Sequence, residues 1–97
     1  MTVLAGNIVE RYFDHEKKAF TPKGKGPKFG IRVLNYWQWQ ELLAAKEDPV
    51  AQVRLAISLS LADIDGSTSM AGEFLANPFS PMVNPLFAAI VDIAAGN

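Results

Sequence analysis

Few residues of this chain could carry out chemistry, and its histidine and cysteine content sets the limit. His15 is the only histidine and cysteine is absent, so no cluster of imidazole ligands, thiolate metal site or disulfide can form. A triad of serine, histidine and aspartate would have to use His15. That residue lies in a charged stretch beside Glu16 and Lys17, which predicts an exposed position. We therefore expect no metal, no cofactor and no nucleophilic triad.

Two short motifs resemble ligand-binding loops but fail on spacing. Asp63 and Asp65 are spaced as at the start of a calcium loop. The sixth and twelfth positions of that loop require Gly and Glu, but they hold Thr68 and Phe74 here. The GKG run at 24–26 lacks the spacing of a phosphate-binding loop, and no helix is expected to start after it. Because no titratable pair matches a motif of acid–base catalysis, we expect a protein that is not an enzyme.

Lysines gather in the first third of the chain, around a segment rich in Pro and Gly. They could contact phosphates, and Phe20 and Phe29 could stack on bases. Residues 1–32 hold seven Lys and Arg against three acids (7 − 3 = +4), whereas residues 33–97 hold two against seven (2 − 7 = −5). A pI of about 5.7 argues against a dedicated nucleic-acid binder, and exposed lysines are common on hairpin tips. The lysines are Lys17, Lys18, Lys23, Lys25 and Lys28.

Tyr36, Trp37 and Trp39 form the most distinctive local feature of the sequence. Neighbouring residues on a helix differ in direction by about 100°, so three aromatics within four residues cannot share one face. We expect Tyr36 and Trp39 on the buried face and Trp37 pointing away from it. An exposed Trp is a typical anchor of a protein interface, whereas a Trp packed under the basic turn would be structural, and both interpretations stay open.

The elements that position these residues belong to one domain, because 97 residues suffice for one domain and not for two. We divide the chain into a basic N-terminal segment with a hairpin, residues 1–34, and a helical core, residues 35–97. The expected fold is mainly α within the α+β class. It is a small bundle of three to four helices with one small β-hairpin near the N-terminus.

Neither a signal peptide nor a membrane span is expected. The first nine residues lack a basic start and a long apolar run. The longest apolar stretch, residues 50–62, contains polar residues and is shorter than the roughly 20 residues of a spanning helix. The absence of cysteine is consistent with a reducing cytosol.

The first helix of the domain is expected near the N-terminus. Leu4, Ile8 and Tyr12 recur every four residues, which favours a short helix over residues 1–13 despite Gly6.

A loop and a strand are expected next. The segment 17–28 contains two Pro and two Gly, which is typical of a loop or a hairpin tip. Residues 29–34 alternate between two faces, which predicts a half-buried strand. Its natural partner is the run 17–21, on the other side of the turn.

Two helix starts follow in the middle of the chain. Asn35 can cap a helix over residues 34–47, and Gln38 lies three residues further on, as in a capping box. Asp48 and Pro49 suit the cap and first position of a second helix that runs to about Ala62. Its apolar stripe is wider than that of a surface helix, which predicts a central helix covered from several sides. The stripe consists of Val50, Val53, Ile57 and Leu61, widened by Leu55 and Leu59.

The last third is expected to hold a turn at 63–67, a short helix at 71–76 and a final helix. The final helix should start at Asn84-Pro85, because a Pro disfavours helical geometry in the residue before it, and Gly96 can end it. Asp92 is its only charge. This helix is therefore either buried within the domain or covered by a partner on its outer face.

The order of these features resembles the tail assembly chaperones of long-tailed bacteriophages. A basic turn leads into FGIRVLNYWQWQELLAAK, then the capped helix DPVAQVRLAISLSLADIDG, a polar spacer and NPLFAAIVDIAAGN. The similarity covers residues 29–97. The matching residues are Ile31, Arg32, Leu34 and Asn35; Pro49, Leu55, Ala56, Leu59, Asp63, Asp65 and Gly66; and Leu86, Ala89, Ile93, Gly96 and Asn97.

The resemblance implies a function in the host cytoplasm during virion assembly, and absence from the mature virion. A chaperone of this family binds the tape measure protein, keeps it soluble and helps recruit the major tail protein. The family often has a longer, frameshifted form. The lack of a membrane span predicts no membrane partner, the pI disfavours nucleic acid, and a homo-oligomer stays open.

A binder of the tape measure protein needs an apolar surface on a rigid scaffold. We predict that exposed apolar side chains supply this surface and that the basic turn steers the chain toward acidic segments. The predicted protein-binding residues are Tyr36, Trp37, Phe79, Met82 and Phe87, together with Lys23, Lys25 and Lys28.

Two alternatives use the same features. The chain could be a small phage-encoded inhibitor that binds a folded host protein, either basic or nucleic-acid-binding, through its acidic half. It could instead be a nucleic-acid-binding module that uses the basic turn, in which case binding should weaken steeply with salt.

Overall fold

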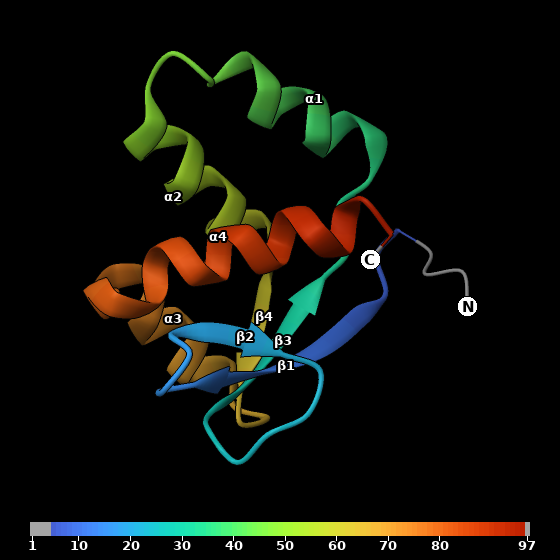
Figure 1. Cartoon of the computed structure of the whole chain (residues 1–97). Coiled ribbons are helices and arrows are strands. Elements are labelled where there is room, and N and C mark those ends of the chain that lie inside the picture. Colours follow the sequence, from blue (N-terminus) through green and yellow to red (C-terminus); the bar gives the residue numbers. More distant parts are fainter. Residues whose placement is uncertain (1–4, 97) are drawn as a thin grey trace.

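The computed structural model describes residues 5–96, and within that range the chain forms four strands and four helices (Figure 1). Their order mixes the two kinds of element, because the fourth strand follows the second helix. The elements are β1 (Ile8–Asp14), β2 (Ala19–Thr21), β3 (Lys28–Arg32), α1 (Tyr36–Ala44), α2 (Pro49–Ser60), β4 (Leu61–Ile64), α3 (Thr68–Ala76) and α4 (Ser80–Ala94).

The strands form one antiparallel sheet in the order β2-β1-β3-β4. The prediction of a helical bundle with one small hairpin is therefore wrong, and the chain has an α+β fold with a four-stranded sheet. Two of the four strands escaped the sequence analysis. The sequence pattern predicts helix for β1, and for β4 it predicts the end of a helix followed by a turn.

The first missed strand is β1, where we expected a helix over residues 1–13. Ile8 and Tyr12 are four residues apart, a spacing that puts them on one side of a strand as well as of a helix. The third member of the pattern, Leu4, lies outside the described residues. In β1 the buried Phe13 lies on the opposite side of the sheet from Ile8 and Tyr12.

The second missed strand is β4, where the second helix was expected to continue to Ala62. The helix ends at Ser60 instead, and Leu61 takes extended geometry (φ −72°, ψ 114°). Residues 61–64 then pair with β3, with an irregular register between Gly30 and Ile31. Only Asp65 and Gly66 form the turn, and both have positive φ (52° and 80°), as a tight two-residue turn between antiparallel segments requires.

The predicted pairing of the third strand with residues 17–21 is also wrong. Residues 19–21 form β2, but β2 pairs with β1, which lies between β2 and β3. A four-residue loop joins β1 to β2, and Lys18 in that loop has φ 53°. The chain then returns over residues 22–27 to the far side of β1.

The helix starts in the middle of the chain are confirmed. Asn35 and Gln38 form a complete capping box at the start of α1, with each side chain accepting from the other's backbone N–H at 2.9 and 3.0 Å. Asp48 caps α2 by accepting from the N–H of Ala51, and Pro49 occupies the first turn. These features depend on residues within one turn of each other, so the local sequence suffices to predict them.

The final two helices start earlier than predicted. Helix α3 begins at Thr68, with Ser67 as its cap. Helix α4 begins at Ser80, and Pro85 lies inside it. Pro81 occupies the first turn of α4, where the missing N–H has no acceptor within the helix, so the helix can start there rather than at Pro85. Gly96 follows the end of α4 with φ 88°, as predicted for a residue that ends a helix.

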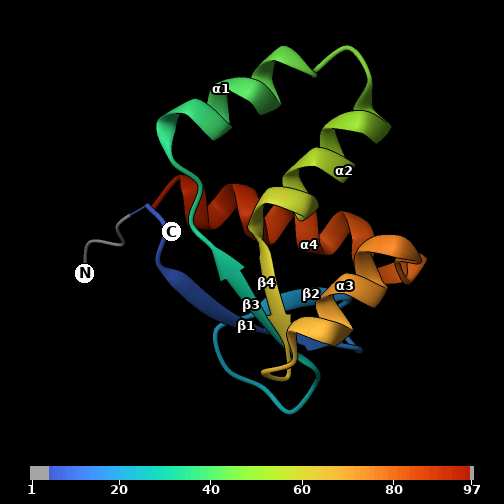
Figure 2. The ribbon, with the colours of Figure 1, turned by 180° about the vertical axis from the view of Figure 1, so that it is seen from behind.

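One face of the sheet carries the core, and α4 runs across it (Figure 1). The opposite face of the sheet is open, and from behind no helix crosses β1 and β3 (Figure 2). Side chains of paired strands share a face, so Val9 and Ile31 lie on the covered side and Tyr12 and Lys28 on the open side. The largest fully buried apolar side chains are Phe29, Ile31, Leu86 and Ile90.

Candidate protein-binding surface

Two aromatic side chains are exposed to solvent at the start of α1. Tyr36 is 64% exposed and Trp37 is 73% exposed, and their rings meet edge to face with centroids 5.1 Å apart. The capping box at Asn35 fixes where the helix starts, and packing of the helix leaves its first two positions in solvent. Trp39 is half-buried and packs against the core. The prediction that Trp37 points away from the core is confirmed, whereas the prediction that Tyr36 shares the buried face is wrong.

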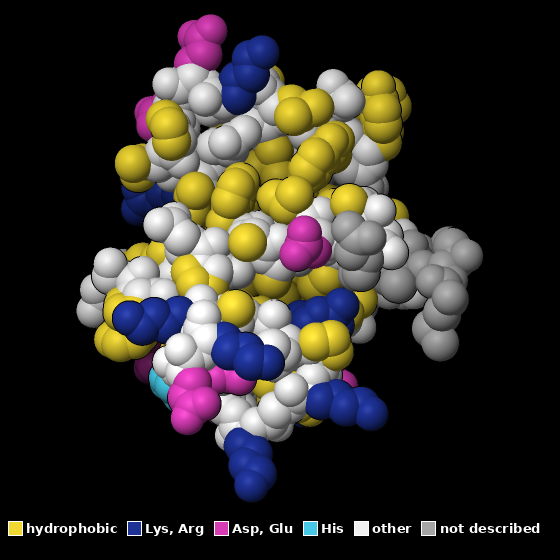
Figure 3. Space-filling view, in the orientation of Figure 1, with side chains coloured by type: hydrophobic (Ala, Val, Ile, Leu, Met, Phe, Trp, Pro, Cys, Tyr) yellow, Lys and Arg dark blue, Asp and Glu magenta, His cyan; other side chains and the backbone are white. Residues whose placement is uncertain are grey.

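Two further apolar side chains are exposed on the hairpin that α1 and α2 form. Leu43 near the end of α1 and Val50 near the start of α2 are both exposed, and Val50 is 77% exposed. We call Tyr36, Trp37, Leu43 and Val50 the hairpin surface. In the space-filling view, hydrophobic side chains gather over α1, α2 and α4 on the face turned to the viewer (Figure 3).

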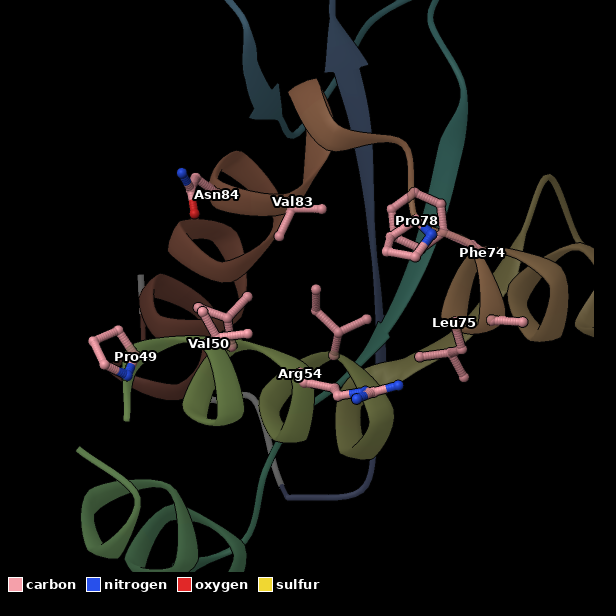
Figure 4. Close-up of a pocket in the computed structure, with 11 residues that line it drawn as sticks. Pro49, Val50, Arg54, Phe74, Leu75, Pro78, Val83 and Asn84 are labelled. Carbon is pink, nitrogen blue, oxygen red and sulfur yellow. The ribbon is translucent and has the colours of Figure 1, made fainter. Parts of the chain in front are cut away.

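A groove opens between α2, the end of α3 and the start of α4, with a volume of about 410 Å³ (Figure 4). Its lining is apolar except for Arg54 and Asn84. We call it the α2 groove. Its lining residues are Pro49, Val50, Val53, Arg54, Ile57, Phe74, Leu75, Ala76, Pro78, Val83 and Asn84.

The α2 groove was missed in the sequence analysis because α2 was expected to be covered along its whole length. The helix is covered at Ile57 and open at Val50. A signal for the opening was present in the sequence, because Arg54 is four residues from Val50 and so belongs to the same side of the helix.

The predicted site residues after α3 do not lie together. Phe79 is 56% exposed just before α4, next to Pro78 of the α2 groove. Met82 is buried in the core, so it cannot serve as an exposed anchor, and its prediction as a surface residue is wrong. Phe87 is half-buried against the core. One side of α4 packs into the core through Met82, Leu86, Ala89, Ile90 and Ile93, and its other side is exposed or half-buried.

The predicted basic turn is divided between a loop and the sheet. Lys23 and Lys25 are exposed in the loop between β2 and β3, where the Lys23 carbonyl accepts from the Thr21 hydroxyl at 2.8 Å. Lys28 belongs to β3, and its ammonium donates to the Glu10 carboxylate at 2.9 Å on the open face of the sheet. This hydrogen bond and the charge of Glu10 raise the pKa of Lys28.

No group of three or more His, Asp and Glu side chains in residues 5–96 could hold a metal ion. His15 is exposed, and its ring meets Phe13 edge to face with centroids 4.9 Å apart.

Within the same residues, no single helix has the length and apolar character to cross a membrane, while the sharply bent pair α3 and α4 meets the test jointly, on length and composition alone.

Comparison with known proteins yields no match, whether with family models, curated proteins or solved structures. A function for this chain therefore has to be inferred from its own sequence and surface.

Proposed function

We propose that this chain is a protein-binding assembly factor, a tail assembly chaperone that holds the tape measure protein of a long-tailed bacteriophage. The observation that carries the proposal is the exposed ring pair of Tyr36 and Trp37. Aromatic side chains of this size bury about 150–250 Å² each, and Trp and Tyr dominate the binding energy of many interfaces. Two large rings that lie side by side in solvent at the start of a capped helix therefore suit the role of an interface anchor.

The hairpin surface suits an elongated apolar partner. Leu43 and Val50 add exposed apolar area on the same helical hairpin, and Val50 also lines the α2 groove. A tape measure protein exposes long apolar stripes until tail subunits enclose it, and covering them requires apolar area on a folded scaffold. The choice of this partner is supported by the sequence resemblance over residues 29–97. In this proposal the chain acts in the host cytoplasm, recruits major tail protein and is absent from the mature virion.

Co-expression of the full chain with fragments of the tape measure protein from the same genome tests the proposal. We expect the fragments to be soluble only in the presence of the chain and to co-purify with it. Trp37→Ala should weaken co-purification, whereas Gln40→Ala, at another exposed position of α1, should leave it unchanged. If both proteins are soluble when expressed together and do not associate, the proposal is wrong.

Recruitment of the major tail protein is tested separately. Purified major tail protein is added to the chaperone–tape measure complex, and a ternary complex is expected in size-exclusion chromatography. If the major tail protein binds neither the complex nor the chain alone, the recruiting part of the proposal is wrong and the binding of the tape measure is unaffected.

A further inference from the structure

The side of α2 that faces the α2 groove changes from buried to exposed along one helix. Val50, Val53, Arg54 and Ile57 follow each other at i, i+3, i+4 and i+7, which places them on one side of the helix. Ile57 is buried, Val53 is half-buried and Val50 is exposed. The apolar residues on this side of α2 therefore run from the core of the domain into the open groove, with Arg54 beside them.

The opposite walls of the groove come from two other helices. Val83 and Asn84 extend from the start of α4, and Leu75 extends from the end of α3 (Figure 4). Helices α2 and α4 pack against each other, and the groove lies between α2 and the start of α4. A gap between splayed helices is filled most readily by a third helix, whose side-chain ridges fit between theirs.

The walls also favour a helical occupant over an extended one. An extended peptide binds by adding to an open strand edge, because its backbone needs hydrogen-bond partners. The groove is lined by three helices and the Pro78 connection, and it has no strand among its walls. A helix satisfies its own backbone groups and needs only apolar contact, which these walls supply.

Arg54 gives the α2 groove a positive charge. It is exposed and is the only charged side chain in the lining. Among residues 5–96, no carboxylate lies within ion-pair distance of its guanidinium. An occupant that brings a carboxylate to this position gains a charge-assisted hydrogen bond without displacing a partner within the domain.

We propose that the α2 groove docks an amphipathic helix of the partner protein, with its apolar side chains against α2 and α4 and an Asp or Glu paired with Arg54. This inference rests on the proposed function, because it states how the partner is held. It adds a second contact area to the Tyr36–Trp37 ring pair. It also states that the segment bound in the α2 groove is an amphipathic helix with an acidic residue.

The test selects helical peptides of about 18 residues from a displayed library against the full chain. Apolar residues are fixed at i, i+4 and i+7, and the remaining positions are randomised. Enriched peptides should carry Asp or Glu at one position beside the apolar stripe. Against Arg54→Glu, the enriched residue at that position should become Lys or Arg. Enrichment without a preference for acids, or without a change on charge reversal, would contradict the proposal.

Binding measurements with one enriched peptide locate the site. Arg54→Glu should weaken binding roughly tenfold, and a peptide with Lys in place of its acid should regain it. Val50→Glu, at an exposed position that the fold does not require, should also weaken binding, whereas Trp37→Ala should not. If Val50→Glu binds as wild type does, the peptide lies elsewhere and the proposal fails.

The two proposals can fail independently. If tape measure fragments bind wild type and Arg54→Glu equally well but bind Trp37→Ala more weakly, the groove is not the docking site and the chaperone proposal stands. If acidic helical peptides bind in the groove and the tape measure protein does not bind at all, the docking site stands and the identity of the partner is wrong.

Discussion

Gly26 lies directly against the backbone carbonyl of Phe13, so closely that a Cβ atom on Gly26 would overlap the carbonyl oxygen. The next residue, Pro27, accepts a hydrogen bond from the Phe13 N–H at 3.0 Å. These contacts hold the loop over residues 22–27 against β1, and thereby set the positions of Lys23 and Lys25. The loop is part of the packed domain and not a free tip.

Gly26→Ala should destabilise the chain by about 1–3 kcal/mol, because backbone atoms would have to move to admit the methyl group. Urea unfolding followed by circular dichroism measures the change. Gly72→Ala is the matched control, because Gly72 lies in α3 with no atom within 4 Å of an added Cβ. There we expect a gain of roughly 0.5–1 kcal/mol from the better helix propensity of Ala. An unchanged stability of Gly26→Ala would contradict the close contact.

The two tryptophans should respond in opposite ways to truncation. Trp37→Ala removes an exposed ring and should change the free energy of unfolding by no more than about 0.5 kcal/mol. Trp39→Ala removes a ring packed against the core and should destabilise the chain by roughly 3 kcal/mol or somewhat less. Chemical unfolding measures both variants. In Trp37→Phe, the remaining fluorescence should be shifted to the blue and less sensitive to acrylamide than in Trp39→Phe, and the reverse result would place Trp37 in the core.

Ser60 should be replaceable at no loss of stability. Its hydroxyl is completely buried at the end of α2 and has no hydrogen-bond partner among the described residues. A buried polar group without a partner costs about 1–3 kcal/mol, so Ser60→Ala should be neutral or up to about 1 kcal/mol more stable. Ser58→Ala is the control, because the exposed Ser58 hydroxyl donates to the Leu55 carbonyl at 2.8 Å. Strong destabilisation by Ser60→Ala, seen as a lower Tm, would mean that the hydroxyl has a partner.

Asp14 should contribute stability that depends on pH. The backbone N–H of Lys17 donates to the Asp14 carboxylate at 3.0 Å and lowers the pKa of Asp14 from its ordinary value of 3.8. This effect outweighs the opposing effect of desolvation, and the N–H of Glu16 also donates to the carboxylate and lowers the pKa. The folded chain thus binds this proton less tightly than the unfolded chain does. The contribution is therefore full above pH 3.8 and is lost as pH falls through the lower, folded-state pKa.

The measurement compares wild type and Asp14→Ala by urea unfolding at neutral and acidic pH. The stability difference should be largest at neutral pH and should shrink below pH 3.8. Asp14→Asn keeps an acceptor oxygen in the turn, so its own difference from Asp14→Ala should persist at low pH. A difference between wild type and Asp14→Ala that is the same at every pH would show that the carboxylate charge does not matter.

What the sequence could predict was local. The capping box of Asn35 and Gln38, the cap at Asp48 and the turn at Asp65 and Gly66 all form from residues within a few positions of each other. Hydrogen bonds between near neighbours, and the few residues that tolerate positive φ, decide such features. The sequence alone was therefore enough to place the starts of α1 and α2 and the end of α4.

The tertiary structure alone decided the sheet and the candidate site. Ile8 and Tyr12 fit a helix and a strand equally well, and only pairing with β3 makes β1 a strand. Leu61 could continue α2 or join the sheet, and β3 supplies the partner that ends the helix. Val50 and Ile57 lie on the same stripe of α2, yet one is exposed and the other buried. Burial and strand pairing depend on segments far away in the chain, so neither can be read from the residues next to them.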